Sequence, residues 1–194
     1  FFDASSCGSM KTPPYVLREG GATLLGRSDD WDWSLVRLKE SPPIGSYFAA
    51  WRAEELPPQA IATAIHHPNG DLKKWSQGTT QGYQPYDDGS SFLMMHWNQG
   101  STEPGSSGSG LFTFLAAGGY YELRGGLWAG DASCVNRAGI DEFSRLDQAL
   151  PYLRQYLTPD STSATGVVPV VEFYHRGLDH YFISTNPVEI NNLD

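Results

Sequence analysis

The 194-residue sequence predicts an all-β fold with many turns and one helix. Short apolar runs recur along the chain between turn signals built from glycine, proline, asparagine and aspartate, which is typical of strands joined by tight connections. The composition agrees, because 21 glycines and 13 prolines accompany six tryptophans and ten tyrosines. This rhythm favours a β-sandwich or a β-barrel, and the length suffices for one sizeable hydrophobic core.

The expected strands follow one another in chain order as apolar runs. They are residues 22–25, 33–38, 62–66, 92–97, 111–115 and 120–123. Between them, turns are expected at Pro42-Pro43, Pro68-Asn69-Gly70, Asp87-Asp88-Gly89 and Gly118-Gly119.

One segment departs from this pattern near the end of the apolar part of the chain. Leu146, Leu150, Leu153 and Leu157 are spaced four, three and four residues apart, which predicts the apolar stripe of a single helix. Proline is tolerated in a helix only near the first turn, so Pro151 is expected there.

The composition changes after this helix. Residues 159–169 have the proline-, serine- and threonine-rich composition of a linker, and two strand-like runs follow it. Some 25 residues cannot bury a core unaided. The sequence therefore predicts one domain over residues 1–158, a linker over 159–169, and the start of a truncated accessory module over 170–194.

The overall charge excludes one class of partner. Twenty-two acidic against 13 basic residues give a formal net charge of −9, which argues against nucleic acid. No apolar run approaches the length of a membrane span. Because the chain opens on Phe1 and not on methionine, we expect a piece of a longer secreted precursor with its export signal upstream.

The two cysteines of the chain, Cys7 and Cys134, either form one bridge or have each lost a partner.

Residues 105–111, Gly-Ser-Ser-Gly-Ser-Gly-Leu, have the form of a serine-protease nucleophile loop. Gly105 and Gly108 can take the positive φ values of a tight turn, so that Ser107 between them keeps its hydroxyl exposed. The amide groups of Gly105 and Ser107 would then be the donors of an oxyanion hole. The alternative is a flexible glycine- and serine-rich loop without catalytic function.

A serine nucleophile needs an imidazole base, which in turn needs a carboxylate to hold its tautomer. Asp32 immediately precedes the expected strand 33–38, a rigid place for such a carboxylate. Asp29 and Asp30 are rivals in the preceding turn. The alternative for Asp32 is an ordinary turn or capping aspartate.

Three motifs in this order resemble those of bacterial lysyl endopeptidases, secreted serine proteases of the trypsin and chymotrypsin type. They are Asp-Trp-Ser-Leu-Val-Arg-Leu at 32–38, Ile-His-His-Pro-Asn-Gly-Asp-Leu-Lys-Lys at 65–74 and Thr-Glu-Pro-Gly-Ser-Ser-Gly-Ser at 102–109. The resemblance runs from Phe1 to about Pro159. It implies a chymotrypsin-type double β-barrel, with the second barrel complete and the first partial, and it implies Ser107 as nucleophile and Asp32 as the triad carboxylate.

In the family the base histidine precedes the aspartate, but the first histidine of this chain is His66. The resemblance therefore implies that the base lies upstream of Phe1 and that this piece alone is inactive or weakly active. It also implies a structural role for His66 and His67. Cys7 and Cys134 fall where similar proteins bridge to other partners, so we expect no bond between them.

The resemblance also implies a substrate pocket. Leu127, Trp128 and Ala129 would belong to the strand that lines it and pairs with the substrate backbone. Asp141 occupies the place of the acidic residue at its bottom, which would select a lysine or arginine side chain. Ser144 stands where a glycine is expected. The alternative for Asp141 is a solvated loop aspartate beside Glu142.

Residues 170–194 are similar to the start of a repeat module on secreted bacterial hydrolases, which implies surface or carbohydrate attachment. His175 and His180 in it are expected to be structural, and no metal or organic cofactor is required. The expected partner is a protein or peptide substrate.

Two other functions compete with this one. An α/β-hydrolase is disfavoured because the Gly-x-Ser-x-Gly elbow is broken by Ser109 at its fifth position. A binding protein that keeps the protease fold without catalysis stays open, because the base histidine is absent from the N-terminal residues.

Overall fold

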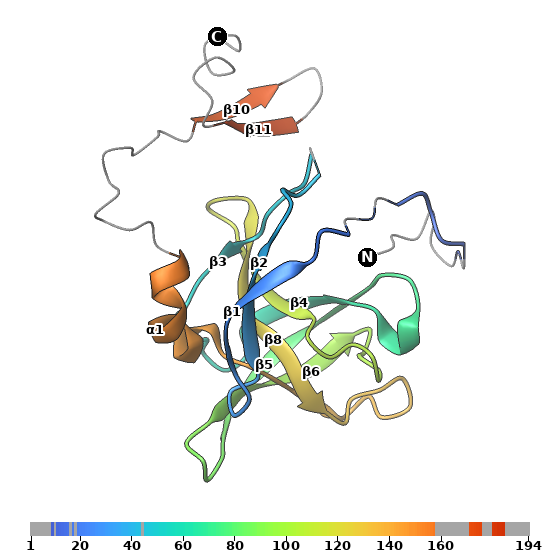
Figure 1. The fold of residues 1–194 in the computed structure, drawn as a ribbon. Coiled ribbons are helices and arrows are strands. Elements are labelled where there is room, and N and C mark those ends of the chain that lie inside the picture. The colour runs from blue at the N-terminus through green and yellow to red at the C-terminus, as the bar shows by residue number, and fades with distance from the viewer. Residues whose placement is uncertain are drawn as a thin grey trace. The chain divides into compact units, whose positions relative to one another are not determined.

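The computed structural model describes residues 9, 11–15, 17, 19–43, 45–157, 171–175 and 180–184, the last two ranges by their backbone. The chain divides into two compact units, Phe1–Arg154 and Gln155–Asp194. In the first unit the structure has mostly strands and one helix, as predicted (Figure 1).

A six-stranded antiparallel barrel forms the body of the first unit. Its strands are β4 (Ile61–His66), β5 (Lys74–Pro85), β6 (Ser91–Gln99), β7 (Gly110–Leu115), β8 (Tyr120–Gly130) and β9 (Ile140–Phe143). They pair in the order β8-β7-β4-β5-β6-β9, and β9 pairs again with β8 to close the barrel. The short strand β3 (Ala50–Trp51) adds in parallel to β8. The barrel resolves the choice that the sequence left open between barrel and sandwich.

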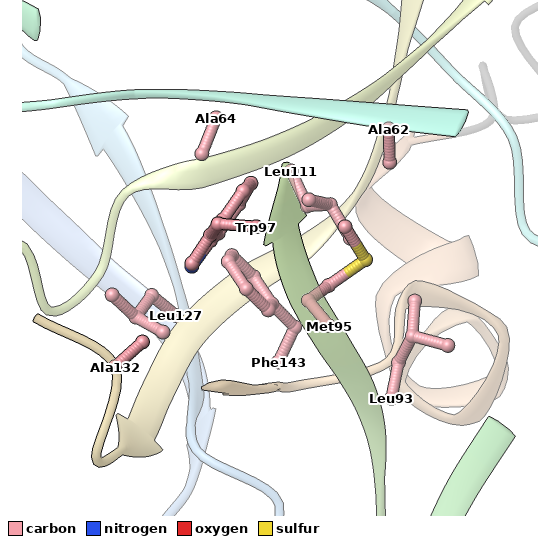
Figure 2. Close-up of a cluster of buried hydrophobic side chains, with 9 residues drawn as sticks. All are labelled: Ala62, Ala64, Leu93, Met95, Trp97, Leu111, Leu127, Ala132 and Phe143. Carbon is pink, nitrogen blue, oxygen red and sulfur yellow. The ribbon is translucent and has the colours of Figure 1, made fainter. Parts of the chain in front are cut away.

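The hydrophobic core lies inside this barrel. Figure 2 shows its side chains turned toward one another from several of the barrel strands. Leu93, Met95 and Trp97 alternate along β6, as residues on one face of a strand must. The cluster consists of Ala62, Ala64, Leu93, Met95, Trp97, Leu111, Leu127, Ala132 and Phe143. Because the barrel buries these residues, the loops at its ends are attached to a rigid base.

The first two strands form a separate hairpin. Strands β1 (Ala22–Ser28) and β2 (Trp33–Leu38) pair antiparallel with a bulge between Leu24 and Gly26, and residues 29–32 form the turn between them. The rings of Trp31 and Trp33 lie 5.2 Å and 6.3 Å from the ring of Tyr152 in the helix, measured between centroids. These aromatic contacts attach the hairpin turn to the helix.

The helix α1 spans Leu146–Leu157, and its apolar stripe buries Ala149 and Leu153. Its existence and bounds match the leucine spacing. The expectation that Pro151 lies in the first turn is wrong, because the helix begins five residues before it. Pro151 is exposed, so the backbone carbonyl that loses its amide donor there can be hydrated.

Little of the second unit is described. Strands β10 (Val171–His175) and β11 (His180–Ser184) pair antiparallel, with His175 opposite His180 in the backbone register. The expected linker 159–169 lies outside the described residues, and the expected domain limits stay a prediction. In the described part of the chain, no helix combines the length and apolar character needed to cross a membrane.

Candidate active site

Two consecutive tight turns build the loop that carries Ser107. In the first, the Ser106 amide donates to the Glu103 carbonyl at 3.0 Å, with Pro104 and Gly105 at the centre. In the second, the Ser109 amide donates to the Ser106 carbonyl at 3.1 Å. Gly105 and Gly108 hold the third position of each turn with φ values of 92° and 79°. Positive φ at this position is the signature of a type II turn, which explains why glycine is required there.

The amide groups of the loop fall into two sets. Those of Ser106, Gly108 and Ser109 donate to backbone carbonyls. Those of Gly105 and Ser107 have no acceptor among the described residues, and both residues are exposed. The two amides that the sequence predicts as oxyanion donors are therefore the two that remain available to a ligand.

The adjacent serines Ser106 and Ser107 have opposite environments. Ser106 is 1% exposed, and its Oγ lies 2.9 Å from Nδ1 of His66. Ser107 is exposed, and its hydroxyl makes no hydrogen bond within the described residues. Ser106 thus anchors the loop, whereas Ser107 presents its hydroxyl to the solvent. The sequence motif gave no indication of this division, and the role of Ser106 was not predicted.

His66 lies at the end of β4 and is 1% exposed. Its Nε2 lies 2.9 Å from Oγ of Ser76 on β5, so both ring nitrogens are hydrogen-bonded. Burial lowers the pKa of the His66 imidazole, and the neighbouring His67 adds to this effect. With both nitrogens bonded to Ser76 and Ser106, His66 has none left for the Ser107 hydroxyl. A His66–Ser106 pair does not have the geometry of a catalytic pair either, because the buried Ser106 Oγ is already held by His66 Nδ1 and the Glu103 amide.

The segment after His66 supports the loop from the side. His67 Nδ1 lies 3.0 Å from the Asp71 carbonyl oxygen, with which it is hydrogen-bonded. The 3₁₀ turn Pro68–Gly70 follows, and the amide of Asn69 donates to the Pro104 carbonyl at 2.7 Å. Asn69 has a φ of 53°, a left-handed value that asparagine tolerates better than most residues. The Pro-Asn-Gly turn, expected from the sequence, thus abuts the nucleophile loop.

Asp32 is the last residue of the turn before β2 and has a left-handed φ of 47°. Its position directly before the strand is as predicted. Its carboxylate forms no hydrogen bond or ion pair with a described residue, Ser107 included. Although Asp32 is largely exposed, the surrounding protein removes part of its solvation and raises the pKa of its carboxyl.

Asp141 lies on β9 and is 2% exposed. Its Oδ2 accepts a hydrogen bond from Trp97 Nε1 at 2.6 Å and a second from the hydroxyl of Thr102. Asp141 is therefore not a solvated loop aspartate, and this alternative is wrong. Burial raises the pKa of its carboxyl against the opposing effect of these donors, and no described lysine or arginine forms an ion pair with it.

The neighbourhood of Asp141 leaves no room for a side chain at Gly130. A Cβ atom there would lie 2.1 Å from Oδ1 of Asp141, well inside van der Waals contact. Gly130 pairs with Asp141 across β8 and β9. Thr102, whose hydroxyl binds the same carboxylate, lies five residues before Ser107 in the chain. The buried carboxylate and the nucleophile loop are therefore connected through a short segment.

The three residues predicted to line the pocket differ in what they expose. Leu127 is buried in the core, and its amide and carbonyl pair with the Ser109 carbonyl and the Gly108 amide at 2.9 Å and 2.7 Å. Trp128 is half-buried and stacks on Phe92 with 3.9 Å between ring centroids. Ala129 is exposed. Leu127 thus fastens β8 to the loop, while Trp128 and Ala129 keep an accessible surface.

Cys134 is an exposed free cysteine, and its backbone amide donates to Glu103 Oε1 at 2.8 Å. Cys7 lies outside the described residues, so the expected absence of a bond between the two stays a prediction. Among the residues that the structure describes, no three histidine, cysteine, aspartate or glutamate side chains gather into a group that could hold a metal ion.

Comparison with known proteins places the chain in a family. Residues 1–144 match the family described as lysyl endopeptidase, C-terminal domain. The match covers 144 of the 194 residues, and the chain belongs to this family of proteins related to serine proteases.

A lysyl endopeptidase of Pseudomonas aeruginosa is 33% identical over 165 residues, which are 82% of this chain and 36% of that protein. The chain thus spans about a third of the length of this relative. Among solved structures, the active form of the Rv3671c protease from Mycobacterium tuberculosis is 14% identical, with a TM-score of 0.49 over 71% of this chain and 59% of that one. Its inactive form has a TM-score of 0.48 at the same identity, over 71% of this chain and 66% of that one.

Proposed function

We propose that the chain is the nucleophile-bearing part of a secreted serine endopeptidase that hydrolyses peptide bonds through an acyl-enzyme. Its strands β4 to β9 would be the second barrel of a chymotrypsin-type fold, and the hairpin β1–β2 would belong to the first. The observation that carries the proposal is the loop geometry. An exposed Ser107 hydroxyl stands between anchored neighbours, beside the two free amides of Gly105 and Ser107.

The proposed chemistry follows from these positions. Ser107 Oγ attacks the scissile carbonyl carbon while a histidine outside residues 1–194 takes its proton, and the amides of Gly105 and Ser107 donate to the resulting oxyanion. Asp32 holds that histidine in the required tautomer. When the tetrahedral intermediate collapses, the imidazolium returns the proton to the leaving amine, and the acyl group stays on Ser107. Water, activated by the same histidine, then releases the acyl group as a carboxylate.

We further propose cleavage after lysine, or arginine, through Asp141. A carboxylate that is 2% exposed and has no cationic partner among the described residues is an unfavourable arrangement by itself. A substrate ammonium or guanidinium group would supply the missing charge. The exposed surface of Trp128 and Ala129 on the adjacent strand would contact the neighbouring substrate residues. Residues 170–194 would serve surface or carbohydrate attachment.

Covalent labelling tests the proposed function. The protein that contains this chain, together with the segment proposed to supply the base histidine, is incubated with a lysyl-mimetic peptide phosphonate, and the modified residue is identified by mass spectrometry. We expect the phosphonate on Ser107, and we expect residues 1–194 alone to label much more slowly. A binding protein without catalysis would bind lysyl peptides but acquire no label, and that outcome would refute the enzyme.

Replacing Asp141 by asparagine tests the proposed specificity. We expect kcat/KM for a lysyl peptide to fall by about 10²- to 10³-fold, because the partner charge in a desolvated site is lost, while a norleucyl peptide is affected little. Glu142→Gln is the matched control on the same strand, since that carboxylate accepts from the Tyr86 hydroxyl on an exposed surface. An unchanged lysyl preference in Asp141→Asn would discard the assignment.

The same replacement has a second expected consequence, for stability. Because burial raises the pKa of Asp141, the native state binds more protons than the unfolded state between about pH 4 and that raised pKa. The free energy of unfolding should therefore fall as the pH rises through this window. Asp141→Asn should lack this fall, because an asparagine amide does not titrate in this range. Thermal unfolding followed from about pH 4 to about pH 8 measures it, and an unchanged pH dependence in Asp141→Asn would contradict the burial effect.

A further inference from the structure

We propose that His66 and Asn69 are positioning residues for catalysis, which hold the two oxyanion amides in their working orientation. This inference rests on the proposed function and deepens it. It gives a role to the Ile-His-His-Pro-Asn-Gly motif at residues 65–70, which the proposed chemistry does not otherwise use.

The planarity of the peptide unit links the direction of each amide to the carbonyl before it. In a trans peptide the carbonyl of one residue and the amide of the next point in opposite directions, so fixing the carbonyl oxygen also fixes the direction of the following N–H. The Gly105 amide shares its plane with the Pro104 carbonyl, and the Ser107 amide shares its plane with the Ser106 carbonyl. The orientation of the two proposed donors is therefore set by what holds the carbonyls of Pro104 and Ser106.

Both carbonyls are held. The Pro104 carbonyl accepts from the Asn69 amide at 2.7 Å. The Ser106 carbonyl accepts from the Ser109 amide at 3.1 Å and from the Ser109 hydroxyl at 2.6 Å. A carboxylate oxygen of Glu103 accepts from the Cys134 amide at 2.8 Å. Asn69 thus holds the first turn through its backbone amide.

His66 fixes the residue between the two donors. Ser106 is 1% exposed, and its Oγ is bonded to His66 Nδ1 at 2.9 Å and accepts from the Glu103 amide at 3.3 Å. The other ring nitrogen of His66 is bonded to Ser76 Oγ at 2.9 Å. Ser76, His66 and Ser106 therefore form one buried chain that runs from β5 through β4 to the loop. A rotation of Ser106 would turn the Ser107 amide with it, and this chain opposes that rotation.

The neutral imidazole of His66 fits this series of hydrogen bonds in either tautomer. One ring nitrogen donates and the other accepts, and each serine hydroxyl can take the complementary role by rotating. Because the ring and both hydroxyls are buried, loss of one partner leaves the next polar atom without a hydrogen bond. The loss of one hydrogen bond in this series is therefore expected to loosen the next one and so to reach the loop.

The test uses Ser106→Ala, His66→Gln and the double variant in the same active protein that contains this chain. We expect kcat to fall on the order of 10- to 100-fold for each single variant, with KM within about threefold, because only the oxyanion geometry of the transition state is disturbed. Affinity for a lysyl peptide boronic acid, whose tetrahedral adduct occupies the oxyanion site, should fall in parallel with kcat. The kcat of the double variant should be no lower than that of the less active single variant, since both replacements remove the same contact.

Thr80→Val is the matched control for a merely structural role. Thr80 on β5 is fully buried, and its hydroxyl donates to the Pro57 carbonyl at 2.6 Å, away from the loop. We expect it to lower the melting temperature as much as Ser106→Ala while kcat stays within about twofold of wild type. If Ser106→Ala does not fold, Ser76→Ala repeats the test one contact further from the loop.

The outcomes separate the two proposals. The positioning role alone would be overturned if the wild type is active and the Ser106 and His66 variants keep kcat within about twofold. It would also be overturned if kcat and KM change together in these variants while the affinity for the boronic acid stays unchanged. A wild type that hydrolyses no lysyl substrate would refute the proposed function and this role with it. A parallel loss of kcat and boronic acid affinity at constant KM would support both.

Discussion

Replacing Ser107 by alanine should lower kcat for a lysyl peptide by at least about 10⁴-fold, the largest effect expected of any single change in the chain. Alanine removes the only hydroxyl that the loop presents to the solvent, whereas the turns depend on the backbone and on Gly105 and Gly108. The folded structure should therefore persist, with an unchanged melting temperature. Residual hydrolysis above the uncatalysed rate would come from substrate binding and from the oxyanion amides.

The measurement is steady-state hydrolysis together with the pre-steady-state burst of released product, which reports the acyl-enzyme. The burst should vanish in Ser107→Ala. Ser46→Ala is the matched control, because the Ser46 hydroxyl is exposed and donates only to the Pro43 carbonyl of its own turn. A Ser107→Ala protein that keeps its burst would remove the nucleophile from the proposal.

Replacing Asp32 by asparagine should lower kcat by about 10⁴-fold, because an amide no longer stabilises the imidazolium and favours the wrong tautomer of the base. Asparagine also tolerates the left-handed φ of 47° at this position, so the turn before β2 should keep its backbone. The loss should therefore appear in kcat and not in the unfolding transition.

Asp30→Asn provides the comparison, since Asp30 lies in the same turn two residues earlier and is exposed. Its kcat should remain within about twofold of wild type. The reverse pattern, in which Asp30→Asn is inactive and Asp32→Asn is active, would show that the wrong aspartate of the turn has been assigned. If both variants keep the activity of the wild type, neither carboxylate belongs to the site.

The strands that the sequence predicts and those that it misses differ in a simple physical way. Strand β6 is predictable because its buried positions carry large apolar side chains such as Leu93, Met95 and Trp97. Strand β5 is not, because its buried positions are Ser76, Gly78 and Thr80, which have the composition of a loop. At Gly78 a Cβ would lie 1.9 Å from the His96 carbonyl oxygen, so the close approach of β5 and β6 requires glycine there. The same glycine makes the strand hard to recognise in the sequence.

The candidate site was predictable where a residue acts through backbone geometry that its own type demands. Gly105 and Gly108 have the positive φ that the motif implied, and Asp32 stands directly before its strand. The anchors were not predictable, since Ser106 and Ser107 are chemically identical and only tertiary structure buries one of them. The burial of Asp141 likewise depends on Trp97 and Thr102, about 40 residues away in the chain.

The decisive measurement is the structure of a phosphonate adduct of the active protein. We expect a covalent bond from phosphorus to Ser107 Oγ, with a phosphonyl oxygen within hydrogen-bond distance of both the Gly105 and the Ser107 amides. We also expect a histidine between Ser107 and the carboxylate of Asp32. An adduct on another residue, or a phosphonyl oxygen turned away from both amides, would refute Ser107 as the nucleophile of this site.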